Sequence, residues 1–252
     1  MKFEDIRSKV QGIPFITEDN ARRLYDLIIE SRPKRILELG VAHGVATCYM
    51  AAALDELGEG EITAVDLIET QKSFSPSPEN LSRQVGLEEY IKIVRMQSGY
   101  NWFLHDQIVT NTVNDTCMPL YDLCIIDGPK NWTIDGAAFF MVDKLLQHGA
   151  HLIFDDYNWT YAEADSRRSE TDGISHRSMS DDERSTPQIR DVFEYLVKQH
   201  PAYGSFQIIE GADWAIAHKS TKPEKTYSVV YRESFAAALH RNVRRVLNKI
   251  TR

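Results

Sequence analysis

The stretch Arg35-Ile-Leu-Glu-Leu-Gly-Val-Ala-His-Gly44 decides the fold of this 252-residue chain. It begins with a short apolar run, 35–39, of the kind that forms a buried strand. Gly40 breaks that run, and segment 46–57, rich in Ala, Met and Leu, has a helical composition with Gly58 at the expected helix end. A strand, a glycine turn and a helix in this order predict a backbone that approaches a ligand closely.

Short apolar strands and helical segments alternate on both sides of this stretch. We expect strands at 61–66, 91–95, 121–127 and 150–154, and helices at 20–31, 78–86, 102–110, 135–147 and 189–199. Such alternation predicts an α/β fold: a Rossmann-like, doubly wound, mostly parallel sheet with helices on both faces. Two last strands, 205–209 and 214–218, are not separated by a long helix. They are expected to complete a seven-stranded sheet as an antiparallel edge hairpin.

Composition limits the class of protein and its partners. Apolar residues make up 42% and charged residues 26%, which suits a single domain over 1–252. The net charge of -8 argues against a nucleic-acid partner. The three cysteines have no paired spacing, so neither a disulfide framework nor a zinc site is indicated. No apolar run approaches the length of a membrane span, and we expect a cytoplasmic protein.

Two segments depart from the alternating pattern. Segment 160–187 is polar and follows the fifth strand, and we interpret it as a lid insertion, with a disordered or solvated insertion as the alternative. The tail 234–252 places apolar residues at helical spacing opposite basic ones, which predicts an amphipathic helix. We expect it to pack on the domain or on a second subunit in a homo-oligomer, in preference to a membrane surface.

Two acidic residues accompany the glycine turn. Glu38 lies inside an otherwise apolar strand, where a carboxylate needs a partner. Asp66 ends the second strand. There its carboxylate can accept hydrogen bonds from the hydroxyls of a ribose, or the residue can simply end the strand at a turn. The turn itself, Gly40-x-x-x-Gly44, lacks the G-x-G-x-x-G pattern of dinucleotide-binding proteins. An NAD-dependent dehydrogenase is therefore not favoured.

With these residues, the sequence resembles the class I S-adenosylmethionine-dependent methyltransferases, whose first motif is similar to Leu37-Glu-Leu-Gly-x-x-x-Gly44. The resemblance covers roughly residues 21–158. It implies that the loop faces the methionine part of the cofactor, that Asp66 holds the ribose and that Ser98 lies near the adenine. The cofactor-binding residues predicted in this way are Glu38, Gly40, His43, Gly44, Asp66 and Ser98.

Three more carboxylates follow the fourth and fifth strands. Asp127 ends one strand, and Asp155 and Asp156 end the next. Neighbouring parallel strands would bring them to one edge of the sheet, where they would repel each other unless a cation lay among them. A set of oxygen ligands favours a hard ion such as Mg²⁺. The alternative is that these residues cap helices, which aspartate does well.

Asp127-x-x-Lys130, followed by Asp155-Asp156, resembles the metal and base pattern of catechol O-methyltransferase and its cation-dependent relatives. The run from Asp155 to Tyr157 also resembles the macrolide-sugar O-methyltransferases. The resemblance implies that Lys130 accepts the proton of a substrate hydroxyl. Two positions depart from it: Asp156 stands where catechol-type enzymes usually have Asn, and Ala46 where a hydroxyl residue is common.

From these patterns we expect an enzyme, an S-adenosylmethionine-dependent and Mg²⁺-dependent O-methyltransferase. Its substrate would be a small hydroxylated molecule, either a phenol or a sugar-bearing metabolite. Trp132, Tyr157 and Trp159 are candidates for the acceptor pocket, with core packing as the equal alternative. The alternatives are a metal-independent methyltransferase on the same fold and a non-catalytic nucleotide-binding module.

Overall fold

The computed structural model describes residues 1–163, 179–221, 234 and 239–240. Its main sheet has seven strands in the order β3-β2-β1-β6-β7-β9-β8, and the pairs between β3 and β7 are all parallel. The two last strands pair antiparallel, β9 with β7 and β8 with β9. The expected doubly wound sheet with an antiparallel edge hairpin is confirmed. The strands are β1 (Arg35–Leu39), β2 (Glu61–Leu67), β3 (Ile91–Met96), β6 (Tyr121–Ile126), β7 (Leu146–Phe154), β8 (Tyr203–Ile209) and β9 (Trp214–Lys219).

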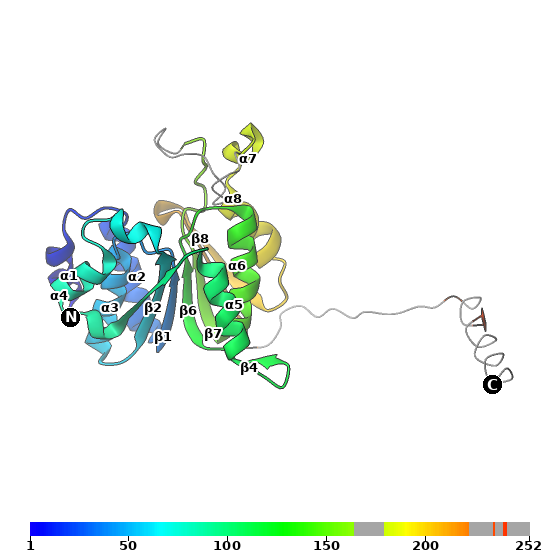
Figure 1. The fold of residues 1–252 in the computed structure, drawn as a ribbon, viewed down its shortest axis with the longest axis horizontal. Helices are drawn as coiled ribbons and strands as arrows, with labels where there is room; N and C mark the ends of the chain where they lie inside the picture. Colours follow the sequence, from blue (N-terminus) through cyan, green and yellow to red (C-terminus); the bar gives the residue numbers. More distant parts are fainter. Residues whose placement is uncertain (164–178, 222–233, 235–238, 241–252) are drawn as a thin grey trace.

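Helices cover both faces of this sheet (Figure 1), and each face has its own hydrophobic core. On one face lie α1 (Phe3–Val10), α2 (Glu18–Ser31), α3 (Val45–Leu57) and α4 (Pro78–Val85). On the other lie α5 (Tyr100–Thr110), α6 (Trp132–Leu145), the short α8 (Gln188–Asp191) and the π-helical turn η3 (Val192–Val197). No helix among the described residues is long and apolar enough to cross a membrane.

Local sequence signals set the ends of the helices beside the site. The Thr17 side chain accepts a hydrogen bond from the backbone N–H of Asn20 and caps α2. Asn131 caps α6 in the same way, through the N–H groups of Thr133 and Ile134. Helix α3 ends at Gly58, which has a left-handed backbone, as the sequence predicts.

Several predicted boundaries were wrong. The helix expected at 135–147 spans Trp132–Leu145, because β7 already begins at Leu146. The helix expected at 189–199 divides into α8 and the π turn η3. The N-terminal helix α1 and the small hairpin of β4 (Thr112–Val113) and β5 (Thr116–Cys117) were not predicted.

The two irregular segments fall largely outside the described residues. Within the expected lid 160–187, residues 164–178 lie outside them, and the remainder contains the short helix α7 (Asp181–Ser185). Of the expected C-terminal helix 234–252, only residues 234 and 239–240 are described. The roles predicted for both segments therefore stay predictions.

The strand order fixes where a ligand can bind. The strand order changes sides at β1. Strands β2 and β3 lie on one side of β1, and β6 and β7 lie on the other. At such a switch point the loops after the two strands separate and leave a crevice at their carboxyl ends. The loops after β1, β2, β6 and β7 all reach this edge, and they contain the predicted site residues.

Candidate active site

Two cavities open at the carboxyl edge of the sheet. The larger, about 650 Å³, is lined by the loops after β1, β2, β3, β6 and β7. The smaller, about 330 Å³, lies between the start of α2, the ends of β6 and β7, and the start of β9. Among the described residues, four line both cavities: Phe15, Asp127, Asp155 and Asp156. The three predicted metal ligands thus lie where the cavities meet.

The turn after β1 forms one wall of the larger cavity and depends on Gly40. Its backbone has φ of +96°, and a Cβ atom here would collide with the backbone carbonyl of Asp127 at the end of β6. Only glycine combines that φ with so close an approach of two strands. The larger cavity therefore has a wall of bare backbone, formed by Gly40, Val41 and Ala42.

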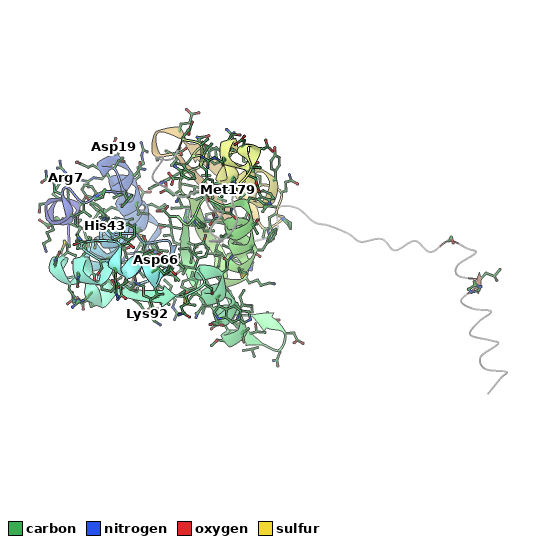
Figure 2. All side chains as sticks on the ribbon, turned by 45° about the horizontal axis from the view of Figure 1, so that its top comes forward. Arg7, Asp19, His43, Asp66, Lys92 and Met179 are labelled. Carbon is green, nitrogen blue, oxygen red and sulfur yellow. The ribbon has the colours of Figure 1, made fainter. Side chains whose placement is uncertain are left out.

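Asp66, at the end of β2, faces this turn from the neighbouring strand. One carboxylate oxygen accepts from the N–H of Ala42 at 3.1 Å and of Val41 at 3.3 Å, and the other from the N–H of Leu67 at 2.7 Å. In Figure 2 Asp66 lies toward the middle of the molecule. Asp66 and Ser98 both line the larger cavity, so the structure brings Gly40, Asp66 and Ser98 together.

Glu38 lies beneath the turn, in strand β1, and is buried. It lines the smaller cavity and accepts a hydrogen bond of 2.6 Å from the Thr47 hydroxyl. Burial outweighs this bond and raises the pKa of Glu38 to about 8. Thr47, the residue after Ala46, uses its hydroxyl for this bond within the fold.

His43 and Gly44 line neither cavity in the described part of the chain. The His43 ring is hydrogen-bonded to the Pro76 carbonyl at 2.8 Å and stacks on Phe15. Gly44 is the residue before α3, and a Cβ there would lie 2.7 Å from the Cβ of Pro78 at the start of α4. In this structure both residues pack the loop against its neighbours, and their predicted contact with the cofactor stays a prediction.

The predicted metal ligands do come together. One oxygen each of Asp127, Asp155 and Asp156 lies within 4.8 Å of the other two. The backbone explains this: Asp155 N donates to the Ile126 carbonyl at 3.1 Å, so β6 and β7 end side by side. Burial, and next the charge of Asp127, raises the pKa of Asp155 to about 8. Such mutual repulsion is what a cation would relieve.

Lys130 lies inside the same cluster. Its ammonium contacts Asp127 and lies 3.1 Å from Asp156. Burial disfavours the charged form, but the three aspartates outweigh it, and the pKa of Lys130 is raised above its usual value. Lys130 and Asp156 both have left-handed backbones (φ 64° and 58°), a conformation that is rare for such residues and often found at functional sites.

Sequence reasoning missed two supporting contacts. The Trp214 indole N–H, from β9, donates to Asp155 at 2.8 Å. Fully buried Asp135 accepts from the Tyr100 hydroxyl and from the backbone N–H of Asn131 at 2.7 Å, which holds the turn that carries Lys130. An aspartate in the first turn of α6 was visible in the sequence, but its partner on α5 was not.

Of the three aromatic candidates for the acceptor pocket, only Trp159 lines a cavity, the larger one. Trp132 lies at the start of α6 and is 41% exposed. Tyr157 turns into the core, where its hydroxyl donates to Glu194 at 2.7 Å. Tyr157 therefore fits the packing alternative, and neither Trp132 nor Tyr157 lines either cavity.

Residues 37–157 match a family model described as a methyltransferase domain. No curated protein matches the sequence significantly. The fold is similar to the O-methyltransferase of Bacillus cereus in complex with S-adenosylhomocysteine, with 16% identity, TM-score 0.58, and 88% and 92% of the two chains covered. A Staphylococcus aureus protein described as a proposed caffeoyl-CoA O-methyltransferase has 22% identity, TM-score 0.58, and 87% and 93% coverage.

A third similar structure is that of TomG from Streptomyces achromogenes, an O-methyltransferase involved in tomaymycin synthesis, in complex with S-adenosylmethionine. It has 15% identity, TM-score 0.57, and 87% and 91% coverage. At these identities the structural likeness establishes the fold, while the family model identifies the domain. The matched segment runs from β1 to Tyr157 just after β7, and it contains the glycine turn and all three clustered aspartates. Segment 37–157 therefore matches a methyltransferase domain, and the chain has the fold of these O-methyltransferases, as the resemblance in its sequence predicts.

Proposed function

We propose that this enzyme transfers the methyl group of S-adenosylmethionine to a hydroxyl oxygen of a small molecule, with the help of a divalent cation such as Mg²⁺. The observation that carries the proposal is the position of the Asp127, Asp155 and Asp156 cluster. It lies at the junction of two cavities, so a donor in one and an acceptor in the other would meet beside it.

The larger cavity suits the cofactor. Its size falls in the usual range for ligand pockets. The bare backbone at Gly40 allows a ligand to approach closely, and Asp66 at the end of β2 offers carboxylate oxygens to two ribose hydroxyls. Ser98 lies in the same wall. We propose these as the cofactor contacts. Two of the similar structures contain S-adenosylmethionine or S-adenosylhomocysteine, which supports the choice of cofactor.

The aspartate cluster suits a hard cation, because all its donors are carboxylate oxygens that repel one another. When bound there, a divalent cation supplies Lewis-acid activation of an oxygen and cancels the charge that keeps Lys130 protonated. Asp127, Asp155 and Asp156 would hold it, and Trp214 fixes the orientation of Asp155.

The other steps belong to residues of this chain. The cavity walls hold the acceptor oxygen in line with the methyl group, which converts a bimolecular reaction into an effectively unimolecular one. Lys130 is buried beside the cluster, and we propose that it accepts the proton of the acceptor hydroxyl. The network of Asp135 and Tyr100 keeps the turn around Lys130 in place.

A second candidate is metal-independent transfer on the same fold. It is favoured by the contacts of Lys130 with Asp127 and Asp156, because an ammonium already compensates part of the cluster charge. In that case Lys130 would position the acceptor and would not accept its proton.

Two measurements test the proposal. Calorimetry with S-adenosylhomocysteine and with NAD establishes the cofactor, and we expect only the first to bind. Transfer of radiolabelled methyl from S-adenosylmethionine to hydroxylated acceptors is then measured after EDTA treatment, with and without added Mg²⁺. We expect EDTA and Asp155→Ala each to remove turnover while binding of S-adenosylhomocysteine is kept. Full turnover in EDTA would establish the metal-independent alternative.

A further inference from the structure

Phe15 occupies an unusual position between the two cavities. It lies in the segment that joins α1 to α2, and it is the one residue outside the aspartate cluster that lines both cavities among the described residues. Phe15 and the three aspartates therefore all border the region where the two cavities meet.

The backbone of Phe15 shows that this position has an energetic cost. Its φ is +87°, a region that bulky residues adopt rarely and at a cost of about 1–3 kcal/mol. Burial does not offset that cost, because the side chain is 60% exposed. The structure thus keeps a strained residue whose ring adds little to the hydrophobic core, which is typical of residues retained for function.

The ring is held in place from the cofactor side. It stacks on His43 with the ring centres 5.6 Å apart, and the edge of Phe74 meets it at 5.9 Å. His43 is itself tied to the Pro76 carbonyl. These contacts come from the glycine turn and from segment 73–77, so the position of Phe15 depends on the loops that surround the cofactor cavity.

The smaller cavity limits what can lie on the other side of this ring. Its volume of about 330 Å³ is near the lower limit for ligand pockets. Its wall is part apolar and part polar: Asp127, Asp155 and Asp156 line the part shared with the larger cavity, while Glu38, Thr17 and Asn20 line the smaller cavity alone. Its apolar lining is formed by Phe15, Ile16, Leu24, Ala46, Ile125, Ile153, Ala212 and Trp214.

We infer that Phe15 determines acceptor specificity: its ring closes the smaller cavity and restricts the methyl acceptor to a compact hydroxylated molecule about one ring in size. The inference rests on the proposed function, since it assumes that the acceptor lies in the smaller cavity. A bulky polycyclic or macrocyclic acceptor would need the space that the ring fills.

The test compares Phe15→Gly with matched variants of the full-length protein. Glycine adopts φ of +87° without strain, so Phe15→Gly removes the ring and keeps or raises the unfolding temperature. Phe15→Tyr keeps the ring and serves as the rescue. Phe140→Leu is the control, because Phe140 is an exposed phenylalanine on α6 that lines neither cavity. Acceptors are catechol and caffeate as compact probes and quercetin as a bulky probe.

The readout is the ratio of kcat/KM for quercetin to that for the better compact probe. We expect at least a tenfold preference of the wild type for the compact probe. Phe15→Gly should raise the ratio at least tenfold, while Phe15→Tyr and Phe140→Leu leave it within about threefold.

Three results would overturn the inference: equal use of quercetin by the wild type, an unchanged ratio in Phe15→Gly, or no transfer to a compact probe by protein that binds S-adenosylhomocysteine. Failure of the wild type to bind S-adenosylhomocysteine would instead overturn the proposed function.

Discussion

Asp66 and Asp155 each lie at or just after the end of a strand in the same sheet, but the two carboxylates differ in their hydrogen-bond donors and in the charges beside them. Asp66 accepts hydrogen bonds from three backbone N–H groups, and Arg95 lies 4.0 Å away. Asp155 has one indole donor and faces two other aspartates, and its pKa is raised to about 8. Backbone donors stabilise the first carboxylate within the fold and hold it in place for a ligand, whereas neighbouring carboxylates repel the second.

This difference assigns cofactor binding and catalysis to two parts of the site. The cofactor edge, formed by the turn at 40–44 and Asp66, consists of groups whose positions the fold fixes, so it can be complete before any ligand binds. The acidic edge, formed by Asp127, Asp155 and Asp156, contains like charges that only a cation, a lysine or a proton can balance. Lys130 provides part of that balance in this structure. We therefore expect substitutions at the first edge to abolish binding and substitutions at the second to abolish turnover.

Gly40→Ala should have the largest effect, on the cofactor edge. Its Cβ would collide with the Asp127 carbonyl, so the turn after β1 and the end of β6 must move apart. We expect affinity for S-adenosylhomocysteine to fall by more than about 100-fold, measured by calorimetry. Gly149→Ala is the matched control, because Gly149 shares the positive φ (+88°) but has open space around its Cβ. Equal losses in both variants would show that backbone strain alone is responsible.

Lys130→Met should act on the acidic edge alone. It removes the proposed proton acceptor, and we expect kcat to fall on the order of 10²- to 10⁴-fold. Binding of S-adenosylhomocysteine should stay within about threefold of the wild type. Lys144→Met, on the exposed side of α6, is the control and should change neither quantity. A Lys130→Met enzyme with normal kcat would remove this residue from the mechanism.

Glu38→Gln tests how the buried carboxyl group in strand β1 makes the stability depend on pH. The pKa of Glu38 is about 8 in the folded state, above its value of about 4.5 in the unfolded chain. The native state therefore binds more protons between these pH values, and this carboxylate lowers stability as pH rises from about 4.5 to 8. Glutamine cannot ionise, so the variant should lose less stability than the wild type over that range, by about 4 kcal/mol.

Urea unfolding at pH 5 and pH 8 measures this difference. Asp155 and Asp135, whose pKa values are also raised by burial, contribute a slope of the same sign in both proteins. The comparison of variant with wild type therefore isolates Glu38. Parallel pH profiles for the two proteins would contradict the expectation.

Thr47→Val should have the smallest effect. It removes the 2.6 Å hydrogen bond to Glu38 at nearly constant volume and leaves a buried carboxyl without that donor. We expect the free energy of unfolding to fall by about 1–2 kcal/mol. Thr47→Ser keeps the hydroxyl and should lose less than Thr47→Val does. If both variants lost the same stability, packing of the methyl group would be the cause.

The sequence alone determined the sheet and its functional edge. Hydrophobic periodicity and glycine positions are local properties, and they predict β1, β2, β3, β6 and β7 with the helices between them. Parallel strands must share a carboxyl edge, so the meeting of Asp127 with Asp155 and Asp156 followed from strand order alone. The resemblance then supplied the choice of cofactor, which strand order cannot give.

Only the tertiary structure decided which neighbours each side chain meets. Trp214 comes from the antiparallel strand β9 to reach Asp155, and Phe15 comes from the N-terminal segment to line both cavities. No local pattern marks either contact, because their partners are distant in sequence and the packing of whole elements brings them together. The same holds for Lys130, whose spacing suggests a base but whose ion pairs with Asp127 and Asp156 arise only when β6 and β7 end side by side.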